Sequence, residues 1–367
     1  MALKPFVQIC LTGDLSTDYR VHKTSMSLIK LGYDVLCISR IKKGFGDTSK
    51  KDYDIKLIKT LFEKGPLFYL EYNLRLFFYL TIHRSDVVLS VDLDTLPGCW
   101  LGTRFRGRKL IFDSHEYFPE VPELQHRKFV KNIWVFLEKF LVPRVDKAYT
   151  VCESIASIYR EKYNKEFNVV RNLPMKQKME SDKQVISDNR FKIVYQGAIN
   201  LGRGIFETLD AMKLLDDVLL VIIGDGDESQ EVKNYINNNQ LSSKVTVLGK
   251  IPFTKLAAYT QSADLGLCLL ENIGLNYYYS LPNRIFDFAL AGVPVLASNF
   301  PEIAKVVGHY HTGLLIDNLK PENIANSIKL LKEDKETYAI MAQNAVEASK
   351  HLIWENEESV LREVFEH

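Results

Sequence analysis

Short apolar runs alternate along the chain with longer stretches in which apolar positions recur every three or four residues. The runs are typical of buried strands and the longer period is typical of helices. In the first half, strands are predicted at residues 6–11, 35–39, 86–91, 109–112 and 147–151, with a helix over 21–31. In the second half, strands are predicted at residues 191–195, 218–223, 245–248, 265–269 and 293–297, with helices from 321 onward. This alternation predicts parallel sheets covered by helices.

The alternation is interrupted at residues 176–190, a polar and charged stretch with little periodicity that is predicted to be a linker. It separates an N-terminal domain over 1–175 from a C-terminal domain over 191–345, and 346–367 is expected to form a helix that packs back on the N-terminal domain. The predicted fold class is α/β, with two doubly wound Rossmann-like domains facing a central cleft. Ligands bind such sheets at the carboxyl ends of the strands.

The stretch LPNRIFDFALAGVPVLAS, residues 281–298, predicts a ligand-facing helix start followed by a buried strand. Asn283 is a candidate helix cap. Arg284 indicates a phosphate site, because free amides and the macrodipole favour anions at a helix start. Asp287, one turn on, is a candidate acceptor for sugar hydroxyls. The alternative is a surface helix on which Arg284 and Asp287 pair with each other.

A second arginine starts a second helix in YQGAINLGRGIFETLDAM, residues 195–212. A strand and a glycine turn at Gly197 are followed by Arg203 and Gly204, which open a helix predicted over 205–214. Two such sites in one domain suit a diphosphate better than a single phosphate. The alternative is a turn glycine beside a solvated arginine.

Composition bounds the class of protein. The 367 residues are about two domains long, and 46% hydrophobic content is ordinary for globular proteins. The five cysteines are scattered singly and predict buried, reduced thiols. The apolar run near the N-terminus is too short for a signal peptide, so the expected location is cytoplasmic.

The net charge of +1 hides an asymmetry between the two halves. Residues 1–180 carry 30 basic and 21 acidic side chains, whereas the remainder carries 17 and 25. The first half therefore suits an anionic surface, either a membrane or a phosphate-bearing substrate, although scattered solvated lysines would give the same count. The overall balance argues against general nucleic-acid binding.

Two further motifs are weaker. IIGDGDES, residues 222–229, fits a dinucleotide fingerprint only at Gly224 and Gly226. In VDLDTLP, Asp92 and Asp94 have the spacing of a metal-binding pair, but nothing nearby completes a ligand set for Mg²⁺. Backbone capping and loop packing are the favoured roles for both aspartates.

Taken together, these segments resemble the retaining, nucleotide-sugar-dependent glycosyltransferases of the GT-B fold, the glycosyl transferases group 1 often numbered family four. In the C-terminal half the resemblance rests on YQGAINLGRG, VIIGDGDES, VTVLGKIPF, YTQSADLGLCLL, LPNRIFDFALAGVPVLAS and HTGLLI. In the N-terminal half it rests on STDYRVHKTSMSLIKLGYDV, SDVVLSVDLDTLP and LIFDSHEYFPEVPE, which are similar to members that build bacterial surface polysaccharides.

The resemblance implies an acceptor-side N-terminal domain and a nucleotide-sugar-binding C-terminal domain. Arg203 and Arg284 would hold the donor diphosphate, Asp287 the ribose, and Lys250 and Ile251 would border the base. The implied donor-binding residues are Gly13, Gly197, Arg203, Gly204, Lys250, Ile251, Asn283, Arg284 and Asp287. The implied catalytic residue is His115, which approaches the donor sugar, and the acceptor side is assigned Asp18, Arg20 and Glu116.

Two positions depart from the family pattern. Tyr279 stands where the first of the family's two glutamates would fall, and Ala198 replaces an arginine, while Glu271 is the nearest carboxylate. Both changes are expected to mark a subgroup. The implied reaction needs no metal or cofactor besides the donor substrate, because two arginines and two helix starts can stabilise the leaving diphosphate.

The acceptor side carries two strongly apolar stretches, 65–83 and 129–142, for which core packing is the favoured role. Neither is predicted to cross a bilayer, since charged and polar residues interrupt the longer one. Basic residues lie close by in sequence, at Arg104, Arg106, Arg108, Lys109, Arg127, Lys128 and Lys131. Aromatic and basic side chains together favour peripheral contact with an anionic membrane. We therefore expect a saccharide or lipid-linked acceptor, reached at the inner face of the cytoplasmic membrane.

Two other functions fit the same architecture. A nucleotide-sugar 2-epimerase would need further acid–base carboxylates, of which no convincing set is evident. A catalytically silent partner subunit that binds a nucleotide sugar is the second alternative, motivated by Tyr279.

Overall fold

A computed structural model describes residues 4–48, 51–176 and 185–366 of the chain. The chain divides into two compact units. Residues 1–172 and 357–367 form the N-terminal unit, and residues 173–356 form the C-terminal unit. Most of the linker predicted at 176–190 lies outside the described residues, which resume at 185.

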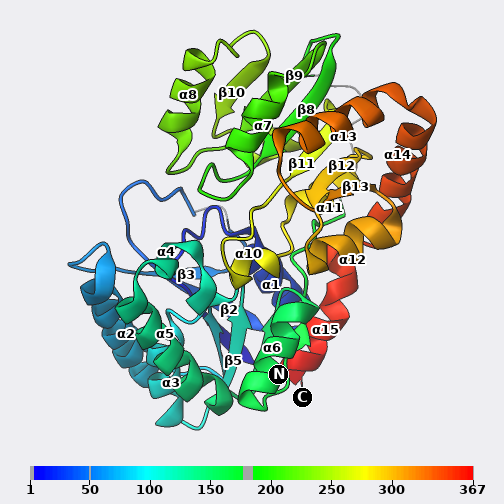
Figure 1. The fold of residues 1–367 in the computed structure, drawn as a ribbon. Helices are drawn as coiled ribbons and strands as arrows, with labels where there is room; N and C mark the ends of the chain where they lie inside the picture. The colour runs from blue at the N-terminus through cyan, green and yellow to red at the C-terminus, as the bar shows by residue number, and fades with distance from the viewer. Residues whose placement is uncertain (1–3, 49–50, 177–184, 367) are drawn as a thin grey trace. The chain divides into compact units, whose positions relative to one another are not determined.

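In the described part of the N-terminal unit, seven parallel strands form one sheet in the order β3-β2-β1-β4-β5-β6-β7 (Figure 1). They are β1 (Phe6–Cys10), β2 (Asp34–Arg40), β3 (Asp54–Ile58), β4 (Val87–Val91), β5 (Lys109–Ser114), β6 (Lys147–Thr150) and β7 (Asn168–Val169). In register, Ile9 of β1 lies opposite Cys37 and Leu89. Every residue of β4 is buried, as expected for a parallel strand covered on both faces.

Helices cover both faces of this sheet. The helices are α1 (Tyr19–Lys30), α2 (Gly65–Ile82), α3 (Leu96–Arg104), α4 (Pro122–Gln125), α5 (Lys128–Leu141) and α6 (Glu153–Tyr163), with short 3₁₀ turns η1 (Phe118–Glu120) and η2 (Val142–Arg144). α5 and α6 cover one face together, since Glu138 of α5 accepts hydrogen bonds from Tyr159 and Lys162 of α6. α1 covers the other face: Asp113 of β5 contacts Arg20 of α1, whereas the next residue, Ser114, contacts Tyr159 of α6. No helix in the described ranges is long and apolar enough to span a membrane.

The C-terminal unit repeats the plan, with six parallel strands among its described residues in the order β10-β9-β8-β11-β12-β13. They are β8 (Phe191–Gln196), β9 (Val218–Ile223), β10 (Val245–Gly249), β11 (Leu265–Cys268), β12 (Val295–Ser298) and β13 (Gly313–Ile316). β8 and β9 are buried along their whole length. The strands bring the loops after β8, β9 and β10 to one edge of the sheet.

Eight helices in the described ranges of this unit connect the strands or follow them. They are α7 (Ile205–Met212), α8 (Ser229–Asn238), α9 (Phe253–Gln261), α10 (Leu275–Tyr278), α11 (Arg284–Leu290), α12 (Pro301–Tyr310), α13 (Pro321–Glu333) and α14 (Lys335–Ser349). A Cβ on Gly266 of β11 would lie 2.4 Å from the ring of Phe288, so glycine lets α11 pack directly on the strand. This close packing fixes the start of α11, where Arg284 lies.

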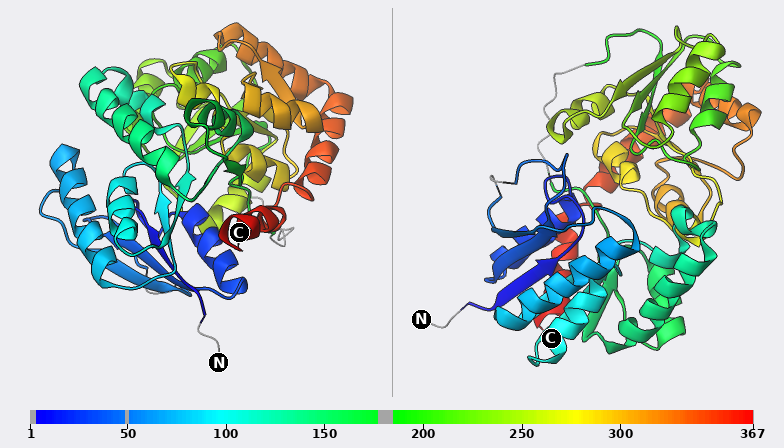
Figure 2. Two further views of the ribbon diagram at one scale, coloured as in Figure 1. Left: turned by 90° about the horizontal axis from the view of Figure 1, so that it is seen from below. Right: turned by 90° about the vertical axis from the view of Figure 1, so that its left-hand side faces the viewer.

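The last helix, α15 (Trp354–Glu366), begins in the C-terminal unit, and from Glu357 onward it belongs to the N-terminal unit. Glu357 accepts hydrogen bonds from the Arg171 guanidinium at 2.6 Å and from its backbone N at 2.7 Å. Glu358 accepts from Ser27 and Lys30, which places α15 beside α1 (Figure 2). Residues 346–367 therefore contain the end of α14 and the separate α15, rather than one helix.

Stretches 65–83 and 129–142, for which core packing was the favoured prediction, are only partly buried. α2 buries one face and exposes another, with Leu67, Leu70, Leu74, Phe78 and Ile82 on the exposed side. In α5, Phe129 and Phe136 are 78% and 66% exposed, whereas Trp134, Glu138 and Leu141 face inward. The reason is Glu138, which accepts from Lys162 at 2.8 Å and from Tyr159 at 3.2 Å and so turns its own face of the helix inward.

Candidate active site

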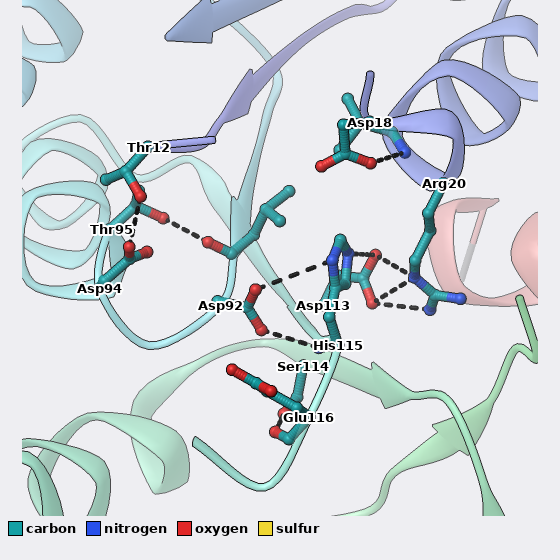
Figure 3. Close-up of polar contacts among 12 residues, drawn as sticks. Thr12, Asp18, Arg20, Asp92, Asp94, Thr95, Asp113, Ser114, His115 and Glu116 are labelled. Carbon is teal, nitrogen blue, oxygen red and sulfur yellow. Dashed lines mark hydrogen bonds and ion pairs between the residues drawn. The ribbon is translucent and has the colours of Figure 1, made fainter. Parts of the chain in front are cut away.

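On the N-terminal unit, a buried chain of charged groups leads to His115, just beyond the carboxyl end of β5 (Figure 3). The Asp113 carboxylate is 1% exposed and receives Arg20 Nη2 at 2.8 Å and Arg20 Nε at 3.1 Å. His115 Nε2 lies 3.0 Å from Asp113 Oδ2. Arg20 Nη1 donates to the carbonyl of Val170 at 2.8 Å. Arg20 thus orients Asp113, and Asp113 orients the histidine ring.

Electrostatics in this chain favour a charged imidazole. Burial opposes ionisation of Asp113, but the charges of Arg20 and His115 outweigh it and hold the Asp113 pKa at about 2. Burial likewise opposes the imidazolium, yet the carboxylates of Asp113 and Asp92 raise the His115 pKa to about 9. Near neutral pH, His115 therefore carries a proton that it can donate through a hydrogen bond.

Asp92 approaches His115 from the end of the neighbouring strand, β4 (Figure 3). Its Oδ1 accepts from the backbone N of His115 at 2.8 Å, and its Oδ2 lies 3.7 Å from the ring Nδ1. Asp92 has φ +57°, the left-handed region that costs a non-glycine residue energy. Burial raises the pKa of Asp92, although 22% of its side chain stays exposed. The capping role predicted for Asp92 is confirmed, and contact with the ring is added.

Asp94 has a separate partner, since Thr12 Oγ1 donates to its Oδ2 at 2.5 Å. Burial raises the pKa of Asp94 to about 6. Loop packing is therefore its role, as predicted. Among the described residues, no three His, Cys, Asp or Glu side chains are placed to hold a metal ion.

The other predicted site residues of the N-terminal unit differ in whether their side chains are free to contact a ligand. Asp18 caps α1 through Oδ1, which accepts from Val21 N at 2.9 Å. Gly13 is exposed and its carbonyl accepts from Ser39, and Glu116 is half-buried after His115. Arg20, assigned to the acceptor side, is only 3% exposed and its guanidinium is fully engaged, so it supports the site from within.

On the C-terminal unit, the ends of β8, β9 and β10 enclose a cavity of about 490 Å³. Gly197, Ala198, Gly224, Lys250 and Ile251 contribute to its lining. A Cβ on Gly224 would lie 1.8 Å from the carbonyl oxygen of Gly197, so two glycine turns touch here. Lys250 and Ile251 thus lie in one cavity with the turn at Gly197.

Arg284 lies against the same turn. It is 6% exposed, its Cζ lies 4.6 Å from the centre of the Tyr195 ring, and a Cβ on Gly197 would lie 3.4 Å from its Nη2. Arg203 stacks in the same way on Tyr277, at 4.6 Å. Neither guanidinium is paired with a carboxylate in the described part of the chain.

The two arginines share a neighbourhood at the end of β11. Burial raises the pKa of the Cys268 thiol, and the charges of Arg284 and Arg203 both act against that rise. Arg284 Nη1 and Arg203 Nε are buried with no hydrogen-bond partner among the described residues. Buried polar groups are normally satisfied, so these two nitrogens are candidates for contact with an anionic ligand.

The remaining donor-side residues differ in their contacts. Asp287 accepts from Gln196 Nε2 at 2.9 Å, and Gln196 Oε1 accepts from Thr260 at 2.8 Å. Gly204 has φ +66° at the start of α7, where a Cβ would lie 2.7 Å from Leu269 Cβ. Asn283 is exposed and makes no side-chain cap, so its predicted capping role is wrong: its backbone is already helical, at φ −55° and ψ −32°.

Sequence reasoning missed Gln196 and Asp113 as supporting residues. Gln196 is the last residue of β8 and Asp113 the next-to-last residue of β5, and a polar side chain is unusual in such buried strands, so that placement was the available signal. Of the two departures, Ala198 lines the cavity, and Tyr279 directly follows α10. Glu271 lines a different cavity of about 310 Å³ with Glu207 and Asp317.

Comparison with known proteins gives this geometry a context. Residues 176–348 match the family model of the glycosyl transferases group 1. An uncharacterized glycosyltransferase of Methanocaldococcus jannaschii is 22% identical over 311 residues, which cover 80% of this chain and 78% of that protein.

Solved structures agree on the fold. Sucrose-phosphate synthase from Thermosynechococcus elongatus matches 99% of this chain and 98% of its own, with a TM-score of 0.79 and 17% identity. Anabaena Alr3699/HepE in complex with UDP and glucose matches 98% of this chain and 99% of its own, with a TM-score of 0.78 and 16% identity. The predicted α/β class and GT-B fold are confirmed.

Proposed function

We propose that this chain, whose residues 176–348 match the family model of the glycosyl transferases group 1, moves a sugar from a nucleotide-diphosphate donor to a saccharide or lipid-linked saccharide acceptor. The anomeric configuration is retained, no metal takes part, and the product belongs to a surface polysaccharide. The resemblance of the N-terminal motifs to polysaccharide-building members supports the last assignment.

The observation that carries the proposal is the pair of unsatisfied guanidinium nitrogens on Arg203 and Arg284. A buried cation without a counter-ion is costly, and a pyrophosphate between the two arginines would satisfy both. The cavity beside Gly197 takes the base at Lys250 and Ile251. Asp287, held by Gln196, accepts from the ribose. The complex of Anabaena Alr3699/HepE with UDP and glucose supports a nucleotide sugar as the donor.

The two arginines stabilise the diphosphate as it leaves the donor sugar. As the sugar–phosphate bond breaks, negative charge grows on the diphosphate, and fixed cations stabilise it more than they stabilise the ground state. The departing phosphate oxygen takes the proton of the acceptor hydroxyl on the same face, which retains the anomeric configuration. His115, protonated and fixed by Asp113, hydrogen-bonds the donor sugar and holds it in place.

The exposed apolar faces of α2 and α5 support peripheral contact with an anionic membrane at its cytoplasmic side. Large apolar side chains such as Leu70, Phe78, Phe129 and Phe136 are 59–78% exposed. Exposed apolar surface of this extent marks interaction sites. A membrane-bound acceptor would account for it.

The test of the donor site is nucleoside diphosphate binding by calorimetry. Arg203→Ala and Arg284→Ala are each expected to weaken UDP or GDP binding roughly tenfold or more, since each charge-assisted contact contributes about 1.5–3 kcal/mol. Lys350→Ala is the matched control, because it removes one charge from the exposed α14 end of the same unit. Unchanged affinity in both arginine variants would refute the phosphate assignment.

The test of the reaction is turnover against a panel of nucleotide sugars, with the anomer of the product read by NMR. Transfer or donor hydrolysis is expected, with product of the donor's configuration. Binding without turnover would instead identify a silent partner subunit, and conversion of free donor to its C2 epimer would identify an epimerase. Turnover that survives chelation of divalent ions is expected from the two-arginine site.

A further inference from the structure

The N-terminal unit carries a second cavity, of about 640 Å³, at the edge of the sheet where β5 and β6 begin. Lys109 and Lys147 are the first residues of these two strands, Arg104 and Arg108 follow from the end of α3, and Arg144 lies in η2. β5 runs from Lys109 at this cavity to Asp113 near the candidate catalytic histidine. The cavity is therefore at the opposite edge of the sheet from His115 and belongs to a different site.

The lining of this cavity is short of negative charge. Five cations face one carboxylate, Asp146, whose Oδ2 already accepts from Leu110 N at 2.6 Å. Arg104 and Lys147 form no ion pair in the described part of the chain. Arg108 and Lys109 are held by backbone carbonyls, those of His83 and of Phe365 among them, which orient the cations without neutralising them.

The cations also repel one another. Burial lowers the pKa of Lys109, and the charge of Lys147 lowers it further. Burial and the charge of Arg106 lower the pKa of Arg108 in the same way. An anion in the cavity would relieve both effects, and a phosphate with several acceptor oxygens suits converging arginines and lysines.

Exposed aromatic and aliphatic side chains lie next to residues that line the cavity, because α2, α3 and α5 all end at this edge of the sheet. Phe105, between Arg104 and Arg106, is 70% exposed, and Ile82 at the end of α2 is equally exposed. The Arg144 guanidinium lies 4.0 Å over the Phe140 ring, on which Phe136 stacks. A soluble phosphate would gain nothing from such a rim, whereas lipid offers an apolar phase directly next to its phosphates.

We propose that this cavity binds the headgroup phosphate of an anionic phospholipid, while Phe105, Phe136 and Ile82 enter the adjoining apolar layer. The proposal deepens the membrane contact suggested above and is independent of the donor chemistry. It identifies one edge of the N-terminal sheet as the membrane-binding edge.

The experiment is co-sedimentation of the full chain with vesicles of phosphatidylcholine alone or mixed with phosphatidylglycerol. The test variant is the triple Arg104→Gln/Arg144→Gln/Lys147→Gln, which leaves Arg108 and Lys109 on their carbonyls. The control is the triple Lys4→Gln/Lys30→Gln/Arg362→Gln, which removes the same charge from side chains that are 55–67% exposed, one before β1, one on α1 and one on α15. We expect binding to mixed vesicles to fall roughly fivefold for each cation removed from the cavity, and the control to bind much as the wild type does.

Two further arms decide the source of the phosphate. Phe105→Ser/Phe136→Ser is expected to weaken vesicle binding while leaving the affinity for soluble glycerol phosphate unchanged. If both triple variants lose vesicle binding equally, or if soluble glycerol phosphate binds the cavity while vesicles do not, the lipid assignment is overturned. UDP binding by each variant reports separately on the donor site, so a failure there is distinguishable from a failure here.

Discussion

Replacing Asp113 by Asn tests whether the buried chain from Arg20 sets the charge of His115. In the folded protein the His115 pKa is raised from 6.5 to about 9, which corresponds to about 3 kcal/mol in favour of the imidazolium. Asp113 is the nearer carboxylate, at 3.0 Å from the ring against 3.7 Å for Asp92. A contacting carboxylate shifts a pKa by about 1–3, so we expect the pKa of His115 to fall to about 7 in Asp113→Asn.

The assay is an NMR titration of ring protons in protein labelled at histidine, with His115→Gln to assign the signal. Asp92→Asn is expected to lower the pKa of His115 less than Asp113→Asn does, because Asp92 is farther from the ring and partly exposed. Glu161→Gln, an exposed substitution on α6, is the matched control. A His115 pKa that stays near 9 in Asp113→Asn, or an Asp92 effect larger than the Asp113 effect, would refute the reasoning.

The same pair gives a pH dependence of stability. The pKa of His115 is higher in the folded state, so its contribution is complete below about pH 6.5 and is lost as pH rises through about 9. The pKa of Asp113 is lower in the folded state, so its contribution is present above about pH 4 and is lost as pH falls toward about 2. Urea unfolding of the wild type should therefore show a falling free energy of unfolding between about pH 6.5 and 9. Asp113→Asn should flatten that fall.

Two substitutions test the fold that positions the sites. Gly266→Ala places a methyl group 2.4 Å from the Phe288 ring and should lower the free energy of unfolding by about 1–3 kcal/mol. In the control Gly308→Ala, the new methyl group would have its nearest neighbour 3.7 Å away and should not destabilise the protein. Equal effects of the two substitutions would count against the packing argument. Glu357→Gln removes the charge that Arg171 contacts at 2.6 Å and should lower the free energy of unfolding by about 1–3 kcal/mol. Urea unfolding measures this effect against the exposed control Glu363→Gln. No difference between the two variants would mean that this ion pair does not stabilise α15.

Much of the fold could be predicted because parallel strands are buried on both faces and leave continuous apolar runs. β9 was predicted residue for residue, and β8 and β10 within one residue of each end. β3 and β7 were missed because burial, which creates the signal, is weak in both: β3 is an exposed edge strand, and β7 has only two residues. β13 is a half-buried edge strand of the C-terminal sheet, and in the sequence it was noted only as the motif HTGLLI.

Which face of a helix is buried was harder to predict, because a helix that is apolar all round gives no direction. α2 has no dominant apolar stripe, so the sequence could not show that Leu70 and Phe78 would stay exposed. In α5, Trp134 and Leu141 share the inward face with Glu138, which pairs with residues of another helix, whereas Phe129 and Phe136 stay exposed. A buried carboxylate must be paired, and its partners Lys162 and Tyr159 lie on another helix, beyond the reach of local periodicity.

Among the candidate site residues, two arginines were equally visible in the sequence and equally buried in the structure, yet they do different work. Arg20 is 3% exposed and Arg284 is 6% exposed. Arg20 donates hydrogen bonds to a carboxylate and a carbonyl within its own unit, so its charge is neutralised by Asp113. Arg284 lies against the Tyr195 ring, and its Nη1 is buried with no hydrogen-bond partner among the described residues, whereas buried polar groups are normally satisfied. Pairing, which depends on residues far away in sequence, therefore distinguishes the positioning arginine, Arg20, from Arg284, for which we propose ligand binding, whereas burial alone does not.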